Sequence, residues 1–162
     1  MDFVDTYLTE LEKSVRELSR DDMRKVCDAL MLAWREERTI FILGNGGSAA
    51  TASHMMNDLN KLTITPGKKR FRAIALTDNM PLVTAWSNDT SFDVVFAEPL
   101  RNLMRPGDYV IAISTSGNSP NLLKAVEAAH EIGGTVIALL GDVGGKLKDM
   151  ADLVVRFPDP HQ

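Results

Sequence analysis

The sequence predicts a doubly wound α/β fold with a five-stranded parallel sheet in the order 2-1-3-4-5. Short apolar runs alternate with helical segments, which is typical of strands buried between two layers of helices. Two runs, Thr39–Leu43 and Tyr109–Ser114, each lead into a loop rich in glycine or hydroxyl residues and then into a helix. Right-handed crossovers favour this order, in which the first and third strands are neighbours. Both loops should therefore open at the same place on the carboxyl edge of the sheet.

The length of 162 residues fits a single domain, 1–162, with N-terminal helices over 1–37 and an α/β core over 38–158. A net charge of −4 argues against a direct nucleic-acid partner or a membrane partner. No run reaches transmembrane length and no signal peptide is visible. Cys27 is the single cysteine, which excludes an internal disulfide and fits a reducing compartment. We therefore expect a cytoplasmic protein.

Two amphipathic helices are expected before the first strand. Apolar residues at helical spacing predict one helix over 2–19, and a second starts at Asp21 or Asp22 and runs to about Glu37. Cys27 falls on the apolar side of the second helix, so we expect a buried structural thiol. The apolar stripe of the first helix must pack on the domain or on another subunit, and the pattern leaves both open.

The remaining elements follow from the same patterns. A helix from Ala49 to Asn60 should be capped by Ser48, and the basic segment 66–70 should be a solvated turn. Ser119 and Pro120 suit the start of a helix that ends at Gly133. Further strands are expected at 72–76, 135–140 and 153–157, with helices running to residue 86 and over 91–104 and 144–151. Pro99 predicts a kink or a fresh start within 91–104.

The two loops have the composition of a phosphate site. Gly44-Asn45-Gly46-Gly47-Ser48 opens a helix, whose first N–H groups and positive end suit an anion. The second loop carries four hydroxyls within six residues: Ser114, Thr115, Ser116 and Ser119. A helix cap plus a polar turn would explain Ser119 and Gly117 but not the other three hydroxyls. We therefore favour phosphate binding, and no P-loop motif is present.

A dinucleotide site is the main alternative for the first loop. Gly44-x-Gly46-x-x-Ala49 meets the loose fingerprint, and Asp78 follows the second strand as a ribose-binding acid would. The interval from Ala49 to Asp78 exceeds the usual spacing of roughly 20 residues. A dinucleotide site would also leave the hydroxyl-rich second loop unexplained, so no nucleotide cofactor is expected.

His54 and Asp58 lie four residues apart on the predicted helix and hence on one face. Asp58 could act as a base and His54 as an acid or a metal ligand, although an exposed helical pair explains the spacing equally well. Two ligands do not complete a zinc site, so others would have to come from elsewhere. The remaining histidines are His130, on a polar helix face, and His161, at the chain end.

These motifs, with Asn88-Asp89, resemble the sugar isomerase (SIS) domain, and more narrowly the phosphoheptose isomerase family and its relatives that associate with the bacterial replication initiator. The resemblance spans nearly the whole chain and implies a flavodoxin-like fold and a homotetramer with the N-terminal helices between subunits. It implies that Asn45 and Asp89 lie near the sugar and that Gly46 and Gly47 are substrate-binding residues. It also implies that the phosphate is bound by Ser48, Ser114, Thr115, Ser116 and Ser119.

The sequence departs from that family in two places. The family's catalytic base is a glutamate, whereas the matching residue is Asp58, one methylene shorter. The family also continues into a last helix whose glutamine and histidine supply the second acid/base group and further zinc ligands, and this sequence stops at Gln162. We therefore expect the 162-residue chain to bind a sugar phosphate but to isomerise it poorly.

The sequence leaves three functions open. The first is an aldose–ketose phosphate isomerase acting on a sugar phosphate such as sedoheptulose 7-phosphate, with His54 and Asp58 as catalytic residues and as the available ligands for zinc. The second is a non-catalytic module that senses a sugar phosphate or binds a regulatory protein partner. The third, which is less favoured, is an NAD(P)-dependent oxidoreductase.

Overall fold

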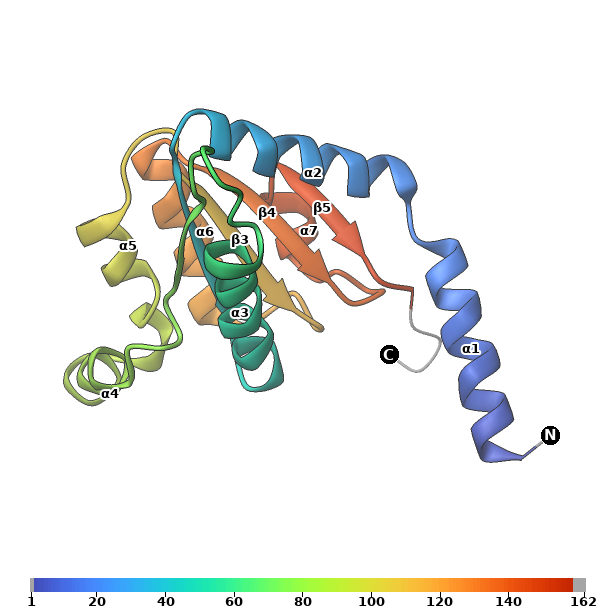
Figure 1. Ribbon diagram of the computed structural model, residues 1–162. Coiled ribbons are helices and arrows are strands. Elements are labelled where there is room, and N and C mark those ends of the chain that lie inside the picture. The colour runs from blue at the N-terminus through green and yellow to red at the C-terminus, as the bar shows by residue number, and fades with distance from the viewer. Residues whose placement is uncertain (1, 159–162) are drawn as a thin grey trace.

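The computed structural model describes residues 2–158, which form a parallel five-stranded sheet with helices on both faces (Figure 1). The strand order is β2-β1-β3-β4-β5, which confirms the predicted topology and makes β1 and β3 neighbours where the order reverses. The strands are β1 (Thr39–Gly44), β2 (Arg72–Ala75), β3 (Tyr109–Ser114), β4 (Thr135–Leu140) and β5 (Leu153–Arg156).

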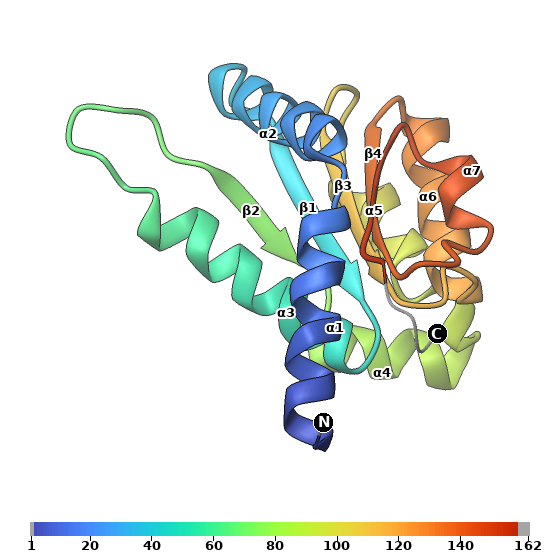
Figure 2. The ribbon, with the colours of Figure 1, turned by 90° about the vertical axis from the view of Figure 1, so that its right-hand side faces the viewer.

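The helices occupy the connections between these strands. Before the sheet come α1 (Phe3–Glu17) and α2 (Arg20–Arg35); after β1 come α3 (Gly47–Asn57) and a π-helical turn, η1 (Asp58–Leu62). After β2 come α4 (Met80–Asp89), a 3₁₀ turn, η2 (Phe92–Val94), and α5 (Ala97–Leu103); the last two helices are α6 (Pro120–Ile132) and α7 (Leu147–Met150). Figure 2, an end view of the sheet, shows α2 and α3 on one side and α6 and α7 on the other. None of these helices is long and apolar enough to cross a membrane.

The sheet separates two apolar cores because alternate strand residues face opposite sides. Phe41 pairs in register with Val110, which pairs with Val136, and all three are buried in the core beneath α5, α6 and α7. The intervening residues, such as Ile42 and Ile111, are buried in the second core with residues of α2 and α3. Strands buried on both faces explain why the sequence reads as continuous apolar runs rather than as alternating ones.

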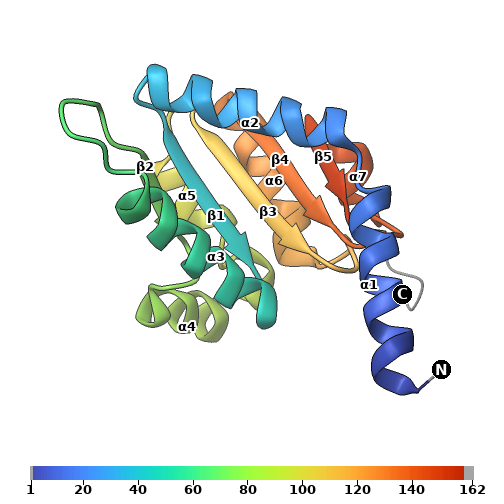
Figure 3. The same ribbon diagram turned by 45° about the vertical axis from the view of Figure 1, so that its right-hand side comes forward.

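Helix α1 extends away from the sheet (Figures 1 and 3). Asp2 caps its start by accepting a hydrogen bond from the N–H of Asp5. Its predicted apolar stripe is solvent-exposed in the single chain: Phe3, Val4, Tyr7, Leu8, Leu11 and Val15. The stripe therefore does not pack on the domain, which was one of the two arrangements the sequence left open.

Three expectations for the first half of the chain were wrong in detail. Helix α2 begins at Arg20 rather than at an aspartate, because the Ser19 hydroxyl accepts a hydrogen bond from the N–H of Asp22. Cys27 is exposed, not buried, because α2 crosses the sheet with other residues, such as Val26 and Ala33, facing the core. The helix expected to reach Asn60 ends at Asn57 and continues as η1.

The later elements differ less from expectation. The segment 91–104 divides into η2 and α5, and Pro99 lies in the first turn of α5, as a fresh start requires. Helix α7 spans only Leu147–Met150 because residues 141–146 form a loop instead. The basic segment 66–70 is fully exposed, as predicted. His130 lies on an exposed position of α6 with its Nε2 3.1 Å from an Asp152 oxygen, and His161 lies outside the described residues.

Candidate functional site

The first loop leaves β1 and enters α3 in a sharp turn. A Cβ on Gly44 would lie 2.8 Å from the Ser48 carbonyl oxygen and from its Cβ, so the strand and helix approach too closely for a side chain here. Gly46 has a φ of 54°, in the left-handed region, and takes the N-cap position with no side-chain hydrogen bond. Ser48 is therefore not the predicted cap but the second residue of α3. Its hydroxyl has no hydrogen-bond partner within residues 2–158.

The second loop joins β3 to α6, and Figure 3 shows β1 and β3 running side by side to the same edge of the sheet. Ser114 is 6% exposed, and its Oγ accepts a hydrogen bond of 3.0 Å from the N–H of Gly117, so this hydroxyl shapes the loop. Ser116 Oγ accepts a weaker hydrogen bond, of 3.4 Å, from the N–H of Asn118. Ser119 is the N-cap of α6 by position, yet its hydroxyl caps nothing. The Thr115 and Ser119 hydroxyls have no partner in the described part of the chain.

The two loops are joined directly by a reciprocal pair of amide hydrogen bonds. The Asn45 Nδ2 donates to Asn121 Oδ1 at 2.9 Å, and the Asn121 Nδ2 donates to Asn45 Oδ1 at 2.8 Å. Asn121 lies in the first turn of α6 and is 1% exposed. Because a buried amide without partners is costly, this pair fixes the first loop relative to the second. Asn45 is thus held by Asn121, whereas the resemblance suggested only a place near the sugar.

A third loop, 141–146, packs against the second. The φ of Gly117 is 63°, and a Cβ there would lie 1.9 Å from the carbonyl oxygen of Gly144, so the two backbones are in direct contact. Asn118 Oδ1 accepts a hydrogen bond from the N–H of Lys146, and Gly117 O accepts one from the N–H of Leu147. The hydroxyl-rich loop is therefore supported on both sides before any ligand arrives.

The candidate acid–base pair lies at the far end of α3 from the first loop, with His54 in α3 and Asp58 at the start of η1. His54 Nε2 lies 3.2 Å from Asp58 Oδ2, and the two side chains are 76% and 39% exposed. They line a pocket of about 610 Å³ together with Thr51, Met55 and other α3 and η1 residues. Both groups are accessible to a solute, and they lie on one face as their spacing predicted.

A second pocket, of about 560 Å³, brings the loops and this helix together. It is bounded by Ser48 and Thr51 of α3, by Ser114 and Thr115 of the second loop, and by an apolar wall. The wall comes from Leu18, Met23, Ile113, Leu139, Leu140, Val155 and Phe157. Thr51 lines both pockets, so a continuous surface runs along α3 from the loops to His54 and Asp58.

The other predicted residues lie near the carboxyl edge without joining this surface through any hydrogen bond. Asp89 is the last residue of α4, is exposed, and accepts a hydrogen bond from the Asn88 side chain. Asp78 is exposed, and one of its carboxylate oxygens, Oδ1, accepts hydrogen bonds from the hydroxyls of Ser53 and Thr77. These two bonds connect the end of β2 to α3 and give Asp78 a role in the fold.

The acid–base pair does not amount to a metal site by itself. A structural or catalytic zinc takes three or four protein ligands, and His54 and Asp58 supply two. No group of three or more His, Cys, Asp or Glu side chains that could hold a metal occurs within residues 2–158. The residues that the structure describes therefore do not fit a complete zinc site.

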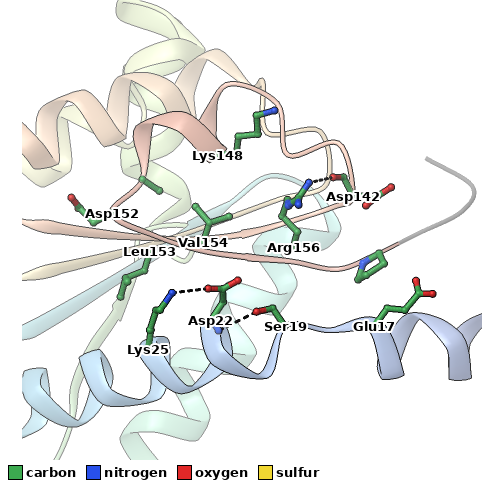
Figure 4. A pocket seen from close by; sticks show the side chains of 12 residues that line it. Glu17, Ser19, Asp22, Lys25, Asp142, Lys148, Asp152, Leu153, Val154 and Arg156 are labelled. Carbon is green, nitrogen blue, oxygen red and sulfur yellow. Dashed lines mark hydrogen bonds and ion pairs between the residues drawn. The ribbon is translucent and has the colours of Figure 1, made fainter.

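A separate pocket, of about 430 Å³, lies at the free edge of β5 (Figure 4). Lys25, Lys148 and Arg156 line it, but Lys25 pairs with Asp22 at 3.1 Å and Arg156 donates to the carbonyl oxygen of Asp142. Figure 4 shows Lys25 and Arg156 directed at their own partners, and no partner for Lys148 among the residues drawn. It is a weaker candidate for an anion than the two loops.

Sequence reasoning missed Asn121, Asn118 and the third loop. Asn121 follows a Ser-Pro helix start, where a polar residue needs no special explanation, so only its burial reveals its role. The Gly144-Gly145 pair in the sequence could have indicated the third loop, because both residues take positive φ values beside Gly117.

Comparison with known proteins places this geometry in a family. The SIS domain model matches residues 3–141. The chain is 42% identical to phosphoheptose isomerase of Mycobacterium tuberculosis over 135 residues, which cover 83% of this chain and 68% of that protein. It is 38% identical to a probable phosphoheptose isomerase of Thermoplasma volcanium, covering 97% and 79% of the two chains. The structure of phosphoheptose isomerase GmhA from Neisseria gonorrhoeae matches with a TM-score of 0.88 at 34% identity, and the match covers 97% of this chain and 85% of that one. The chain belongs to the SIS domain family.

Proposed function

We propose that this SIS domain binds a sugar phosphate between its two loops and acts as an aldose–ketose phosphate isomerase of the phosphoheptose isomerase type. The observation that carries the proposal is the joining of the two loops by Asn45 and Asn121, beside hydroxyls that have no other partner. The names of the relatives supply the substrate class, with sedoheptulose 7-phosphate as the substrate to test.

The phosphate group is assigned to the second loop and the start of α3. Ser48, Thr115, Ser116 and Ser119 donate hydroxyl hydrogen bonds, while Ser114 acts through the loop backbone that its Oγ holds. Helix N-termini add N–H donors and a positive potential. Such donors stabilise the negative charge of a bound phosphate without a basic pocket, in a chain whose own net charge is −4.

The sugar extends along α3 toward His54 and Asp58, with Gly46, Gly47 and Asp89 nearby. Asp58 is the base that moves a proton between C1 and C2 through an enediol, and His54 assists at the oxygen. Among the described residues that line this surface, His54 and Asp58 are the acid–base pair, and a positioned proton-transfer group is worth about 10² to 10⁴ in rate. We therefore expect slow turnover. Zinc is not assigned a step, because the described ligands do not complete its site.

The oligomer is proposed from α1. Its uncovered apolar stripe supports association of copies through residues 1–37. We propose a homotetramer in the cytoplasm.

A non-catalytic module that senses a sugar phosphate, or that binds a regulatory protein through these apolar surfaces, is the second candidate. Within the described residues the His54–Asp58 pair has no third His, Cys, Asp or Glu beside it, which fits binding without turnover.

The binding step is tested by titration calorimetry with sedoheptulose 7-phosphate. The Ser116→Ala and Ser119→Ala double variant should bind at least about tenfold more weakly, because hydrogen bonds to a charged group are worth about 1.5–3 kcal/mol each. Thr9→Ala, which removes an exposed hydroxyl of α1, is the control and should keep the wild-type affinity. Unchanged affinity in a folded double variant rules out this phosphate site. Aldose formation that disappears in Asp58→Asn separates the isomerase from the sensing module.

A further inference from the structure

We propose that Asn60 is the residue that positions the Asp58 carboxylate. Its side chain attaches the π-helical turn η1, which begins at Asp58, to strand β2. The inference rests on the proposed function, since it takes Asp58 as the base.

The attachment consists of two hydrogen bonds to one residue of the strand. Asn60 Nδ2 donates to the carbonyl oxygen of Ala73 at 2.8 Å, and Asn60 Oδ1 accepts from the N–H of Ala73 at 3.0 Å. The carboxamide thus satisfies both backbone groups of a strand residue, as a neighbouring strand would. Strand β2 pairs only with β1 in the described structure, so Asn60 occupies part of its open edge.

The position of Asp58 depends on the backbone because its side chain has few contacts of its own. Its carboxylate contacts the exposed His54, at 3.2 Å, and the side-chain amide of its neighbour Asn57, at 3.3 Å. No other hydrogen bond or ion pair holds it within residues 2–158. Its direction is therefore set by the helical segment on either side.

That segment is fixed at both ends. Ala52, on the preceding turns of α3, is fully buried against the sheet, and Asn60, two residues after Asp58, is bonded to β2. Between them the helix changes from α to π geometry at Asp58. π-Helical turns are rare and are frequent at functional sites. Leu59 of the same turn also packs against the second core, so loss of the Asn60 bonds would loosen the turn rather than release it and would let the carboxylate move relative to the loops.

Protection of the sheet edge is the competing explanation, because an open edge is a hazard that proteins cover. The two explanations predict different results for the environment of His54. If Asn60 positions Asp58, removing Asn60 changes the His54–Asp58 contact. If it only covers the edge, that contact stays the same in the folded protein.

The decisive measurement is the His54 ring resonance in NMR spectra of the full chain, assigned through His54→Gln. Asn60→Ala should move this resonance toward its position in Asp58→Asn and should raise amide hydrogen exchange over 58–62. Asp108→Ala is the matched control: Asp108 also holds two backbone N–H groups, those of Thr39 and Arg105, but at the amino end of the sheet. It should leave the His54 resonance unchanged.

Asn60→Asp provides a second variant if Asn60→Ala fails to fold. It keeps an acceptor for the N–H of Ala73 and loses the donor to its carbonyl, so we expect an intermediate shift of the resonance. A wild-type His54 resonance in either folded Asn60 variant overturns the inference.

The catalytic measurement separates this inference from the proposed function. Asn60→Ala should lower kcat about tenfold to a hundredfold with little change in KM, since a displacement of roughly 1 Å can cost about a hundredfold in rate. In the Asp58→Asn background the same substitution should cost nothing further. If the wild-type chain does not turn over sedoheptulose 7-phosphate, the proposed function fails, and the His54 resonance still decides the role of Asn60.

Discussion

The amide pair between Asn45 and Asn121 allows a quantitative prediction. Asn121→Ala removes two hydrogen bonds, of 2.8 and 2.9 Å, at a site that is 1% exposed. A buried hydrogen bond contributes about 0.5–1.5 kcal/mol, and a partner left unpaired adds to the loss. We therefore expect the free energy of unfolding to fall by about 2–3 kcal/mol. That is a large share of the roughly 5–15 kcal/mol of a typical domain.

A double-mutant cycle isolates the pair itself. Urea unfolding of Asn45→Ala, Asn121→Ala and the double variant should give a coupling energy of about 1–2 kcal/mol, because either single change already breaks both bonds. The control combines Asn45→Ala with Asn118→Ala, which removes the bonds of Asn118 to Lys146 and Ser116 but shares no partner with Asn45. The control pair should be additive within about 0.5 kcal/mol.

The same pair should matter for ligand binding because it fixes the position of the two loops relative to each other. Asn121→Leu, which keeps the volume but not the hydrogen bonds, should weaken sedoheptulose 7-phosphate binding about tenfold in calorimetry. Additive unfolding energies for Asn45 and Asn121, or full affinity in Asn121→Leu, would refute the reasoning that these amides hold the site together.

Three further predictions concern other parts of the chain. Burial, with a smaller contribution from Glu36, raises the pKa of the Tyr109 phenol. The neutral phenol therefore stabilises the folded protein fully below the unfolded pKa of about 10, and this contribution to the unfolding free energy is lost as the pH rises through the folded pKa. Unfolding free energies above pH 10 should accordingly fall less steeply in Tyr109→Phe than in the wild type, and equal slopes would contradict this. Gly117→Ala should cost more than about 1 kcal/mol in urea unfolding, because the positive φ and the backbone of the third loop leave no room for a Cβ; a neutral effect would contradict the loop contact. Leu8→Asp with Leu11→Asp should reduce the sedimenting species from a tetramer to a smaller form, and a wild-type monomer at micromolar concentration would disprove association through α1.

Most of the fold could be predicted from the sequence because it depends on periodicity and connection rules. The strands over 109–114 and 135–140 were predicted with their exact bounds, since short, β-branched apolar runs bounded by Gly, Pro and Asp favour strands over helices. The strand order followed from handedness. Helix ends were less accurate. Ser19 rather than Asp21 or Asp22 caps α2, because three of the four residues 19–22 could each serve as a cap.

The candidate site could be located but not built from the sequence. The two loops and the spacing of His54 and Asp58 were visible, because local motifs carry them. Asn121, Asn60 and Asp78 act through partners 76, 13 and 25 residues away, respectively, and no local pattern encodes such contacts. Cys27 was placed wrongly because an apolar neighbourhood on a helical wheel does not show which part of the stripe the sheet covers.

The most direct test of the central claim, a sugar-phosphate site between the two loops, is a crystal structure of the 162-residue chain soaked with sedoheptulose 7-phosphate. The account predicts the phosphate within hydrogen-bond distance of the Ser116 and Ser119 hydroxyls, with the sugar directed along α3 toward Asp58. A phosphate bound instead among Lys25, Lys148 and Arg156 at the edge of β5, with the two loops empty, would contradict it.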